Sequence, residues 1–372
     1  MKELSTSGSG LHPRGWELPQ GLLQPRDLLD PASTQPATCW AAHRAWRRRS
    51  GALLPHWKLG GAQAGAAVSA VERTVVPMEK TTVLITGCSS GIGLGLAVRL
   101  AADDSRRFKV FATMRDLAKG EQLLERLGGR CPDTLELLQL DVTDPHSLAA
   151  AVRCMQGQHP DVLVCNAGVG LMAPLEMCSE QAMRAVFEVN VFGTARTIQA
   201  FLPAMKHRRS GRILVSSSVG GLQGVPFNAV YCASKFALEG LCESLAIVLR
   251  PFNIHMTLVE CGPVHTAFMD NARRADPEGH ELRALDAETQ QLYRRYLQHC
   301  AQLFLDAAQE VDEVLQVFLE AIAAPRPPLR CITARLPAPL ARLRPGGPDG
   351  ADYVRAMHDF VFGPGEAAEE QP

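Results

Sequence analysis

The sequence predicts an α/β fold, a doubly wound parallel sheet of Rossmann type in a single domain with an inserted substrate lid. Short, continuously apolar segments alternate with longer segments of helical period from Thr82 to Val259. Parallel strands that helices bury on both faces have this composition. A glycine-rich turn, Thr86–Leu94, joins the first strand to the first helix, and right-handed crossovers then build the doubly wound sheet.

The elements follow from these alternating patterns in chain order. The expected strands are Thr82–Thr86, Lys109–Met114, Glu136–Leu140, Val162–Cys165, Arg212–Ser217, His255–Val259 and Leu329–Thr333. The expected helices are Gly91–Ala102, Leu117–Leu127, Pro145–Met155, Ser179–Glu188, Val191–Arg208, Tyr231–Leu249 and Gln309–Ala323. We expect an irregular insertion over Cys261–Phe304, and a short amphipathic period at Tyr353–Phe362 in an otherwise loosely packed tail.

Residues 1–77 differ in composition from the rest of the chain. They contain all four tryptophans and carry a net charge of +4, against −5 for the remainder. Without a regular apolar period they are expected to be disordered. A targeting segment and a variant extension before Met78 are the alternatives. We expect the Rossmann-type domain at 78–343, with a lid at 263–305, and a C-terminal tail at 344–372.

Composition excludes several classes of function. A net charge of −1 argues against nucleic-acid binding, and no segment approaches the roughly 20 apolar residues of a membrane span. The eleven cysteines are scattered without a C-x-x-C pair. This distribution favours reduced thiols in a cytoplasmic protein and no metal site, because the Cys/His spacing of a zinc dehydrogenase is missing.

The glycine-rich turn has the spacing of a dinucleotide-binding site. Its first glycine permits the tight turn, the second lets the backbone approach a pyrophosphate, and the third lets the helix pack close to the strand. The free N–H groups at the helix N-terminus then bind phosphate. A plain strand–helix turn is the alternative. The residues assigned here to the cofactor are Gly87, Ser89, Ser90, Gly91, Ile92 and Gly93.

The end of the second strand favours NADPH over NADH. Met114 stands where NAD enzymes have an acidic residue for the ribose 2′-hydroxyl, and Arg115 follows. A guanidinium binds a 2′-phosphate in a bidentate manner. We therefore expect NADPH/NADP⁺, with NADH weaker. The alternative is that Arg115 only pairs with Asp116 at the surface.

Two further strand ends fit the same cofactor. Asp141-Val142 follows the third strand, where a carboxylate accepts from the adenine amino group. The small residues Asn166-Ala167-Gly168 follow the fourth strand and leave room for the cofactor. Either segment alone could be an ordinary turn.

Tyr231 and Lys235 carry the expected chemistry. Their i, i+4 spacing places them on one helix face, and a neighbouring ammonium lowers the pKa of a phenol toward the range useful for proton transfer. Ser218 follows the fifth strand and can hold a substrate oxygen. Asn190, expected at the start of the long helix after strand four, could anchor a water leading to Lys235.

Together these residues resemble the short-chain dehydrogenase/reductase family over about Thr82 to Thr266. The motifs are Thr86-Gly-x-x-x-Gly-x-Gly93, Asn166-Ala-Gly168, Asn190, Ser218, Tyr231-x-x-x-Lys235 and Pro263-Val-x-Thr266. The resemblance implies that Asn190, Ser218, Tyr231 and Lys235 are catalytic. It also places Val264, at the nicotinamide carboxamide, Thr266, Tyr231 and Lys235 in the cofactor site.

Segments 83–94, 231–246, 260–269 and 353–358 are similar to the branch of this family that contains the 17-beta-hydroxysteroid dehydrogenases. That resemblance implies a cytosolic homodimer that reduces estrone to estradiol with NADPH in steroid biosynthesis. His299 is implied to bind the phenolic end of the steroid. The implied substrate residues are Ser218, Val219, Val225, Asn228, Tyr231, Pro263, Tyr296, His299 and Phe304.

Several positions depart from this branch and leave alternatives. The branch has a pocket glutamate near Arg335 and a methionine at Gln223. Photoreceptor retinol dehydrogenases share that glutamine, so reduction of all-trans-retinal is the alternative activity. They have a bulky residue at Gly221 and a cysteine-rich C-terminus, whereas this chain has no cysteine after Cys331. A regulator that binds the cofactor without catalysis is a further alternative, and the presence of both Tyr231 and Lys235 argues against it.

Overall fold

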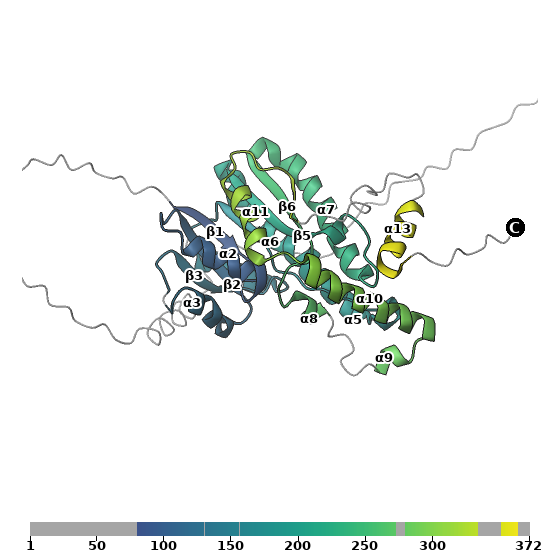
Figure 1. Ribbon diagram of the computed structural model, residues 1–372. Coiled ribbons are helices and arrows are strands. Elements are labelled where there is room, and N and C mark those ends of the chain that lie inside the picture. Colours follow the sequence, from purple (N-terminus) through teal and green to yellow (C-terminus); the bar gives the residue numbers. More distant parts are fainter. Residues whose placement is uncertain (1–79, 130, 156, 273–279, 334–350, 364–372) are drawn as a thin grey trace, which may run out of the picture. The chain divides into compact units, whose positions relative to one another are not determined.

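The computed structural model describes residues 80–129, 131–155, 157–272, 280–333 and 351–363. Their centre is a seven-stranded sheet in the order β3-β2-β1-β4-β5-β6-β7 (Figure 1). Every strand pair is parallel, which confirms the predicted fold class. The order reverses between β1 and β4, and the crevice at such a switch point is where doubly wound folds bind ligands.

The strands lie within two residues of the predicted ranges. They are β1 Thr81–Ile85, β2 Phe108–Met114, β3 Leu135–Gln139, β4 Val162–Cys165, β5 Gly211–Ser218, β6 Ile254–Cys261 and β7 Arg330–Ile332. The helices around them are α2 Gly91–Ala101, α3 Glu121–Arg126, α4 Pro145–Cys154, α5 Glu180–Phe187, α6 Thr194–Arg208, α7 Ala229–Leu249 and α11 Val311–Ala323. The expected helix Leu117–Leu127 begins as a 3-10 turn, because the Asp116 carboxylate accepts from the Ala118 N–H before α3 starts.

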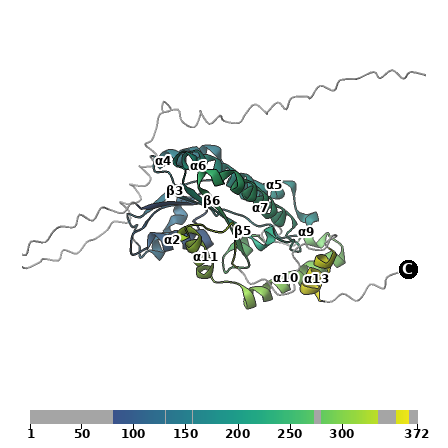
Figure 2. The same ribbon diagram turned by 90° about the horizontal axis from the view of Figure 1, so that it is seen from above.

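Helices cover both faces of the sheet. Figure 2 shows α2 and α11 on one side, and α4, α6 and α7 on the other. The first layer buries Leu96 of α2 and Phe318 of α11 in one cluster with side chains of β1, β2, β5 and β6, and the second buries Phe201 and Leu238 against β4, β5 and β6. Since both faces are covered, β4 is buried along its whole length. Its continuously apolar sequence has this physical cause.

The position of Asn190 differs from the expected start of a helix. The structure joins α5 and α6 through a π-helical turn, Glu188–Gly193, instead of starting a new helix. Asn190 lies inside that turn and is fully buried. A π turn inserts one extra residue into the helix and often occurs at functional sites.

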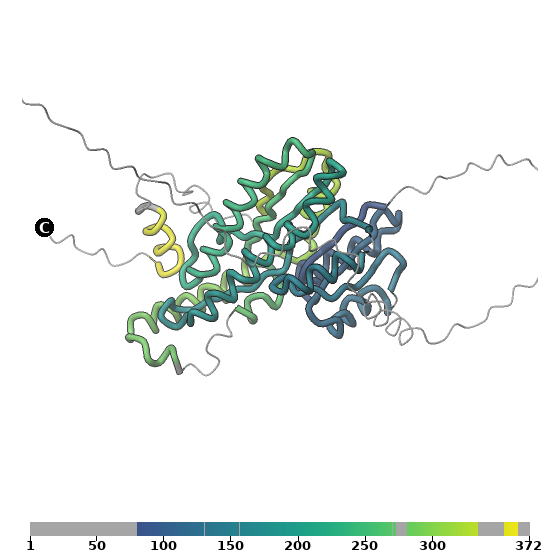
Figure 3. The backbone as a smooth tube through the Cα atoms, turned by 180° about the vertical axis from the view of Figure 1, so that it is seen from behind, coloured from purple at the N-terminus to yellow at the C-terminus, as the bar shows by residue number. Residues whose placement is uncertain are grey.

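Ordered helices follow β6 where an irregular insertion was expected. They are α8 Phe268–Ala272, α9 His280–Arg283 and α10 Ala287–Ala307. Asp286 caps α10 by accepting from the Thr289 N–H at 2.8 Å. The C-terminal helix α13, Ala351–Phe362, packs beside α10 (Figure 3). The amphipathic period expected at 353–362 therefore forms a packed helix.

Some expectations fall outside the described residues. These are the extension at 1–77 and the position Arg335. Within the described part of the chain, no helix is long and apolar enough to cross a membrane.

Candidate active site

The glycine-rich turn has the backbone geometry that its sequence requires. Gly87 and Gly91 have φ of +74° and +57°, a region that side chains rarely adopt. A Cβ on Gly87 would lie 2.9 Å from the Ala167 Cα, and one on Gly93 would lie 2.5 Å from the Gly87 carbonyl oxygen. Glycine is thus required both for the turn and for the close approach of helix and strand.

The N-terminus of α2 is free to receive an anion. Its first helical hydrogen bond is donated by the Leu94 N–H to the Ser90 carbonyl oxygen, so the preceding N–H groups have no partner within the helix. The Ser90 side chain makes no capping hydrogen bond, and the first turn holds no acidic residue. Ser89 is half-buried just before the helix, and Ile92 lies in the first turn of α2. This end of α2 fits a pyrophosphate.

Arg115 lies exposed immediately after β2. Its carbonyl oxygen accepts from the Gln139 side chain at 3.0 Å, which fixes the backbone there. In the part of the chain that the structure describes, its guanidinium forms no ion pair with Asp116, whose carboxylate instead caps the following turn. The guanidinium therefore remains available to a 2′-phosphate.

The ends of β3 and β4 border the same crevice. The Asp141 carboxylate accepts from the Thr143 hydroxyl at 2.7 Å and from the Thr143 N–H at 2.9 Å, and Val142 is buried beside it. Asn166 and Ala167 both donate their N–H groups to the Thr86 hydroxyl, at 2.9 and 3.0 Å. Thr86 thus links the ends of β1 and β4, a role that we did not assign to it from the sequence.

The pair Tyr231 and Ser218 forms the centre of the candidate site. A Cβ on Gly220 would lie 3.5 Å both from the Ser218 Oγ and from the Tyr231 Cε1, so the two side chains lie next to each other. The Lys235 ammonium lies 5.7 Å from the centre of the Tyr231 ring and donates to the Ser216 carbonyl oxygen at 2.9 Å. The i, i+4 spacing on α7 therefore brings phenol and ammonium together at the end of β5, as the sequence predicted.

The electrostatics of the pair differ from the expectation. Burial raises the pKa of Tyr231 above its ordinary value, although the hydrogen bond with Ser218 opposes this. Burial lowers the pKa of Lys235 to about 8. The prediction that Lys235 lowers the pKa of the phenol was therefore wrong. The Lys235 ammonium donates to Ser216, and the loss of water around the buried phenol has the largest effect on its pKa.

Asn190 organises the space beside Lys235. Its side-chain oxygen accepts from the Val169 N–H at 2.9 Å, and its amide donates to the Val169 carbonyl oxygen and to the Ser234 hydroxyl, both at 3.0 Å. A Cβ on Gly168 would lie 3.5 Å from the Asn190 oxygen and 3.8 Å from the Lys235 Nζ. Gly168 therefore keeps open the space between these two groups.

Part of the expected substrate set forms a mainly apolar cluster, which we call the substrate wall. Tyr296 is buried in a cluster with Met172 and Tyr293, and Val225 packs against it. The Asn228 amide, at the N-cap of α7, donates to the Tyr296 hydroxyl at 2.7 Å. Val219 directly follows Ser218 in a 3-10 turn. The ring of Phe268 on α8 lies 5.5 Å from that of Tyr231, a neighbour that we did not predict.

His299 lies on α10, three residues after Tyr296. Its Nε2 is buried and has no hydrogen-bond partner among the described residues, and burial lowers the pKa of its imidazole. The ring of Phe360 on α13 packs edge-on against it, with 4.9 Å between the ring centres. A polar atom in this state can receive a ligand hydroxyl.

Phe304 lies apart from the substrate wall. Its ring is 6.3 Å from that of His265, on the side of the cofactor loop. In that loop the carbonyl oxygen of Pro263 accepts from the Gln309 N–H at 2.9 Å. Val264 is buried, and a Cβ on Gly91 would lie 3.4 Å from the Thr266 Cγ2. The structure therefore brings Val264 and Thr266 to the glycine-rich turn, and Phe304 toward the same side.

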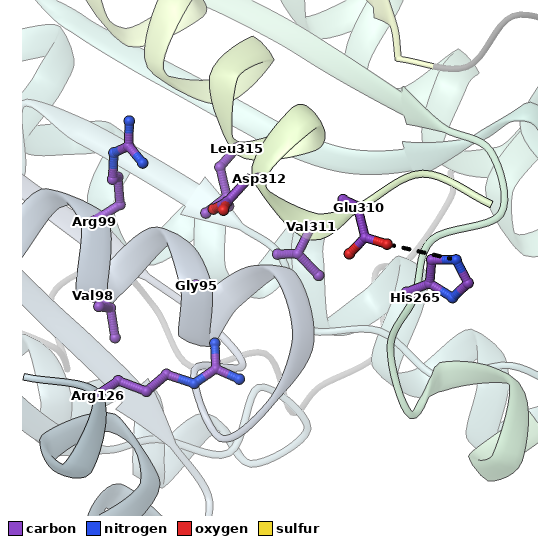
Figure 4. A pocket seen from close by; sticks show the side chains of 9 residues that line it. All are labelled: Gly95, Val98, Arg99, Arg126, His265, Glu310, Val311, Asp312 and Leu315. Atoms are coloured by element: carbon purple, nitrogen blue, oxygen red, sulfur yellow. Dashed lines mark ion pairs between the residues drawn. The ribbon is translucent and has the colours of Figure 1, made fainter.

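A surface cavity of about 430 Å³ opens behind this loop. Figure 4 shows His265 paired with Glu310, at 3.8 Å, and Arg99 and Arg126 at the other side of the cavity. Helices α2 and α11 contribute most of the lining residues. The cavity is therefore distinct from the substrate wall.

The site and the fold define the class of protein. A family model described as short chain dehydrogenase matches residues 81–277, and the chain belongs to this family of oxidoreductases. A short-chain dehydrogenase/reductase from Burkholderia phymatum, solved in complex with NAD, superposes with a TM-score of 0.59 at 26% identity, covering 76% of this chain and 94% of that one.

More similar relatives are known by sequence. The 17-beta-hydroxysteroid dehydrogenase type 1 of Homo sapiens is 55% identical over 288 residues, which cover 77% of this chain and 87% of the relative. Retinol dehydrogenase 8 of Homo sapiens is 49% identical over 282 residues, covering 76% and 90%. The chain is thus similar to both, and more similar to the first.

Proposed function

We propose that this protein is an NADPH-dependent 17-ketosteroid reductase, which acts as a 17-beta-hydroxysteroid dehydrogenase and forms estradiol from estrone. One observation carries the proposal. Ser218 and Tyr231 lie next to each other beside the buried Lys235 in a chain that is 55% identical to human 17-beta-hydroxysteroid dehydrogenase type 1.

The chain's own residues fit a nicotinamide cofactor. The free N–H groups of α2 suit the pyrophosphate, and Gly87 and Gly91 let the backbone approach it. Arg115 suits the 2′-phosphate, which favours NADPH over NADH. Lys235 and the loop at Val264 would hold the nicotinamide end. When bound, such a cofactor supplies the hydride.

Ser218 and Tyr231 would bind the carbonyl oxygen and stabilise the charge that develops on it. The Tyr231 phenol carries its proton near neutral pH, and it is the group that we assign to protonate that oxygen, as reduction requires. Lys235, with a pKa of about 8, is matched to returning a proton to the phenol. Asn190 borders the path beside Gly168.

The substrate end suits a flat, apolar ketone with one distant hydroxyl. Val225 and Tyr296 offer apolar surface, and the unpartnered His299 Nε2 is the polar group that we assign to that hydroxyl. Residues 263–305, which include α8 and α10, would act as the lid that excludes water.

Apolar side chains on the outside favour a homodimer. Phe192 is 51% exposed in the π turn, and Phe236, Ile247 and Val248 on α7 are 46%, 71% and 56% exposed. A surface of this kind is typical of protein–protein contacts. Every described cysteine is a free thiol, which favours a reducing compartment such as the cytoplasm.

The test is the initial rate of the purified full chain with NADPH and estrone, androstenedione or all-trans-retinal. We expect the highest kcat/KM with estrone. A large preference for all-trans-retinal would replace the steroid assignment with a retinal reductase, the activity indicated by the retinol dehydrogenase relatives. NADPH binding without turnover of any of these carbonyl compounds would favour the alternative of a regulator that binds the cofactor without catalysis.

A further inference from the structure

Arg330, on the edge strand β7, joins the sheet to α7 through three carboxylates. Its Nε lies 3.2 Å from an oxygen of Glu239 and 3.2 Å from one of Glu260, and its Nη2 lies 3.4 Å from one of Glu243. The Glu260 side chain is fully buried and that of Glu239 is 8% exposed, whereas that of Glu243 is 57% exposed. Arg330 therefore pairs with two buried carboxylates, and its loss would remove a positively charged partner from each.

Glu239 reaches from this network to the reactive end of β5. Its second oxygen accepts from the Ser217 hydroxyl at 2.5 Å, and Ser217 directly precedes Ser218. A Cβ on Gly221 would lie 3.1 Å from the Lys235 carbonyl oxygen and 3.2 Å from the Glu239 Cγ. Glycine at this position thus permits the tight packing of α7 against the turn after β5.

Glu239 also lies one helical turn after Lys235, on the same face of α7. The groups whose charge acts on Lys235 are the Cys261 thiol of β6 and, on α7, the Glu239 carboxyl and the Cys242 thiol. Burial raises the pKa of Cys261 to about 11 and that of Cys242 to about 12. Both thiols stay neutral near pH 7, so Glu239 is the member of this set that carries charge.

Among the described residues, the other elements around Lys235 present mainly neutral or paired groups to it. On β5 the Ser216 carbonyl oxygen accepts from Nζ, and the π turn presents the neutral amide of Asn190. The Tyr231 phenol is protonated near neutral pH, because burial raises its pKa. On β6, the Glu260 carboxylate is paired with Arg330.

We propose that Glu239 is a positioning residue, which stabilises the ammonium form of Lys235 and holds the end of β5 through Ser217, and that Arg330 keeps Glu239 charged for this task. The inference rests on the proposed function, in which Lys235 returns a proton to Tyr231. It extends the proton-supplying apparatus from the crevice to an edge strand that lies 91 residues further along the chain.

The charge of Glu239 determines the direction in which its removal shifts the pKa of Lys235. An anion near Lys235 favours its protonated form, so removal of that anion makes the ammonium lose its proton at lower pH. Burial raises the pKa of Glu239, while the hydrogen bond from Ser217 and the charge of Arg330 oppose this. Loss of Arg330 would therefore neutralise Glu239 more readily and act in the same direction.

The test is the pH dependence of kcat/KM for ketone reduction by the full chain at saturating NADPH. Glu239→Gln keeps the shape of the side chain and an oxygen for Ser217. For this variant we expect the fall of kcat/KM at high pH, the alkaline limb of the profile, to move to lower pH by about one unit. At pH values below that limb the variant should retain its activity. Glu239→Asp, which keeps the charge, should move the limb less.

Glu243→Gln is the matched control, because it removes an exposed partner of the same Arg330. We expect it to keep the parental profile. Arg330→Gln should move the alkaline limb of kcat/KM to lower pH, as Glu239→Gln does. It provides a second test if one of the two variants fails to fold. Thermal unfolding of each variant separates a change in profile from a change in stability.

An unchanged limb in a folded Glu239→Gln or Arg330→Gln protein would overturn the inference, as would an equal shift in Glu243→Gln. A different result would contradict the proposed function. Full turnover by Tyr231→Phe would overturn the role of the phenol whatever the profile of Glu239→Gln. An inactive Tyr231→Phe with an unshifted Glu239→Gln would overturn only the role of Glu239.

Discussion

The Lys235 ammonium donates a hydrogen bond of 2.9 Å to the carbonyl oxygen of Ser216, at the end of a central strand. The bond supports a cation that is 5% exposed. Burial lowers its pKa to about 8, below the value of about 10.4 for a lysine in water. The folded protein therefore holds this charge at a cost in free energy below pH 8, and that cost is relieved as the pH rises toward 10.4.

Lys235→Met should consequently be more stable than the parent at pH 7, because it removes a buried charge. The advantage should shrink by about 1 kcal/mol between pH 7 and pH 9, since the parent sheds its proton over that range. Denaturant unfolding of both proteins at the two pH values measures this. A stability difference that is independent of pH would contradict the lowered pKa of Lys235.

Tyr231→Phe should lower kcat by a factor of about 100 to 10,000, the usual contribution of a general acid. The affinity for NADPH should persist, because the phenol is not among the groups that we assign to the phosphates. Single-turnover rates and fluorescence titration with NADPH separate the two effects. Ser218→Ala should also slow the reaction, as it removes the hydrogen-bond partner of Tyr231.

Arg115→Ala should weaken NADPH binding by about 1.5 to 3 kcal/mol, the range for a hydrogen bond to a charged group. NADH binding should change little, because NADH lacks the 2′-phosphate. Arg99→Ala is the matched control, since Arg99 is exposed on α2 and borders the separate cavity of Figure 4. Equal weakening of NADPH and NADH by Arg115→Ala would remove the argument for cofactor preference.

Gly93→Ala should destabilise the fold by about 1 to 3 kcal/mol, the typical cost of forcing atoms into a packed site. The added methyl group would lie 2.5 Å from the Gly87 carbonyl oxygen and also against the Asn166 side chain. Gly240→Ala is the control, because nothing lies within 4 Å of a Cβ there. In the middle of α7 it should stabilise the protein by about 1 kcal/mol. Thermal unfolding reports both changes.

Much of the fold and of the site could be predicted from local patterns. The strands and the glycine-rich turn follow from apolar runs and from glycine spacing, and Tyr231 and Lys235 follow from the period of one helix. These features depend on residues that are close in sequence. The same holds for Ser218, which directly ends its strand.

Features that depend on tertiary packing were not predictable in this way. The π turn at Asn190 differs from a helix start only in how the backbone hydrogen bonds are shifted, and composition does not show that. The direction of the Tyr231 pKa depends on how much protein surrounds the phenol. The pairing of Glu239 with Arg330 joins positions 91 residues apart, for which the sequence carries no local signal.

The reactive side chains lie in one stretch of the chain, whereas several of the helices beside the substrate wall come from a later stretch. Ser218, Tyr231 and Lys235 lie between β5 and the first turns of α7, whereas α8, α10 and α13 all follow β6. After gene duplication, drift confined to the last third of the coding sequence could therefore change which carbonyl compound enters while proton delivery is inherited intact. Relatives named for a steroid and for retinol, each matching about three quarters of this chain, fit such a history.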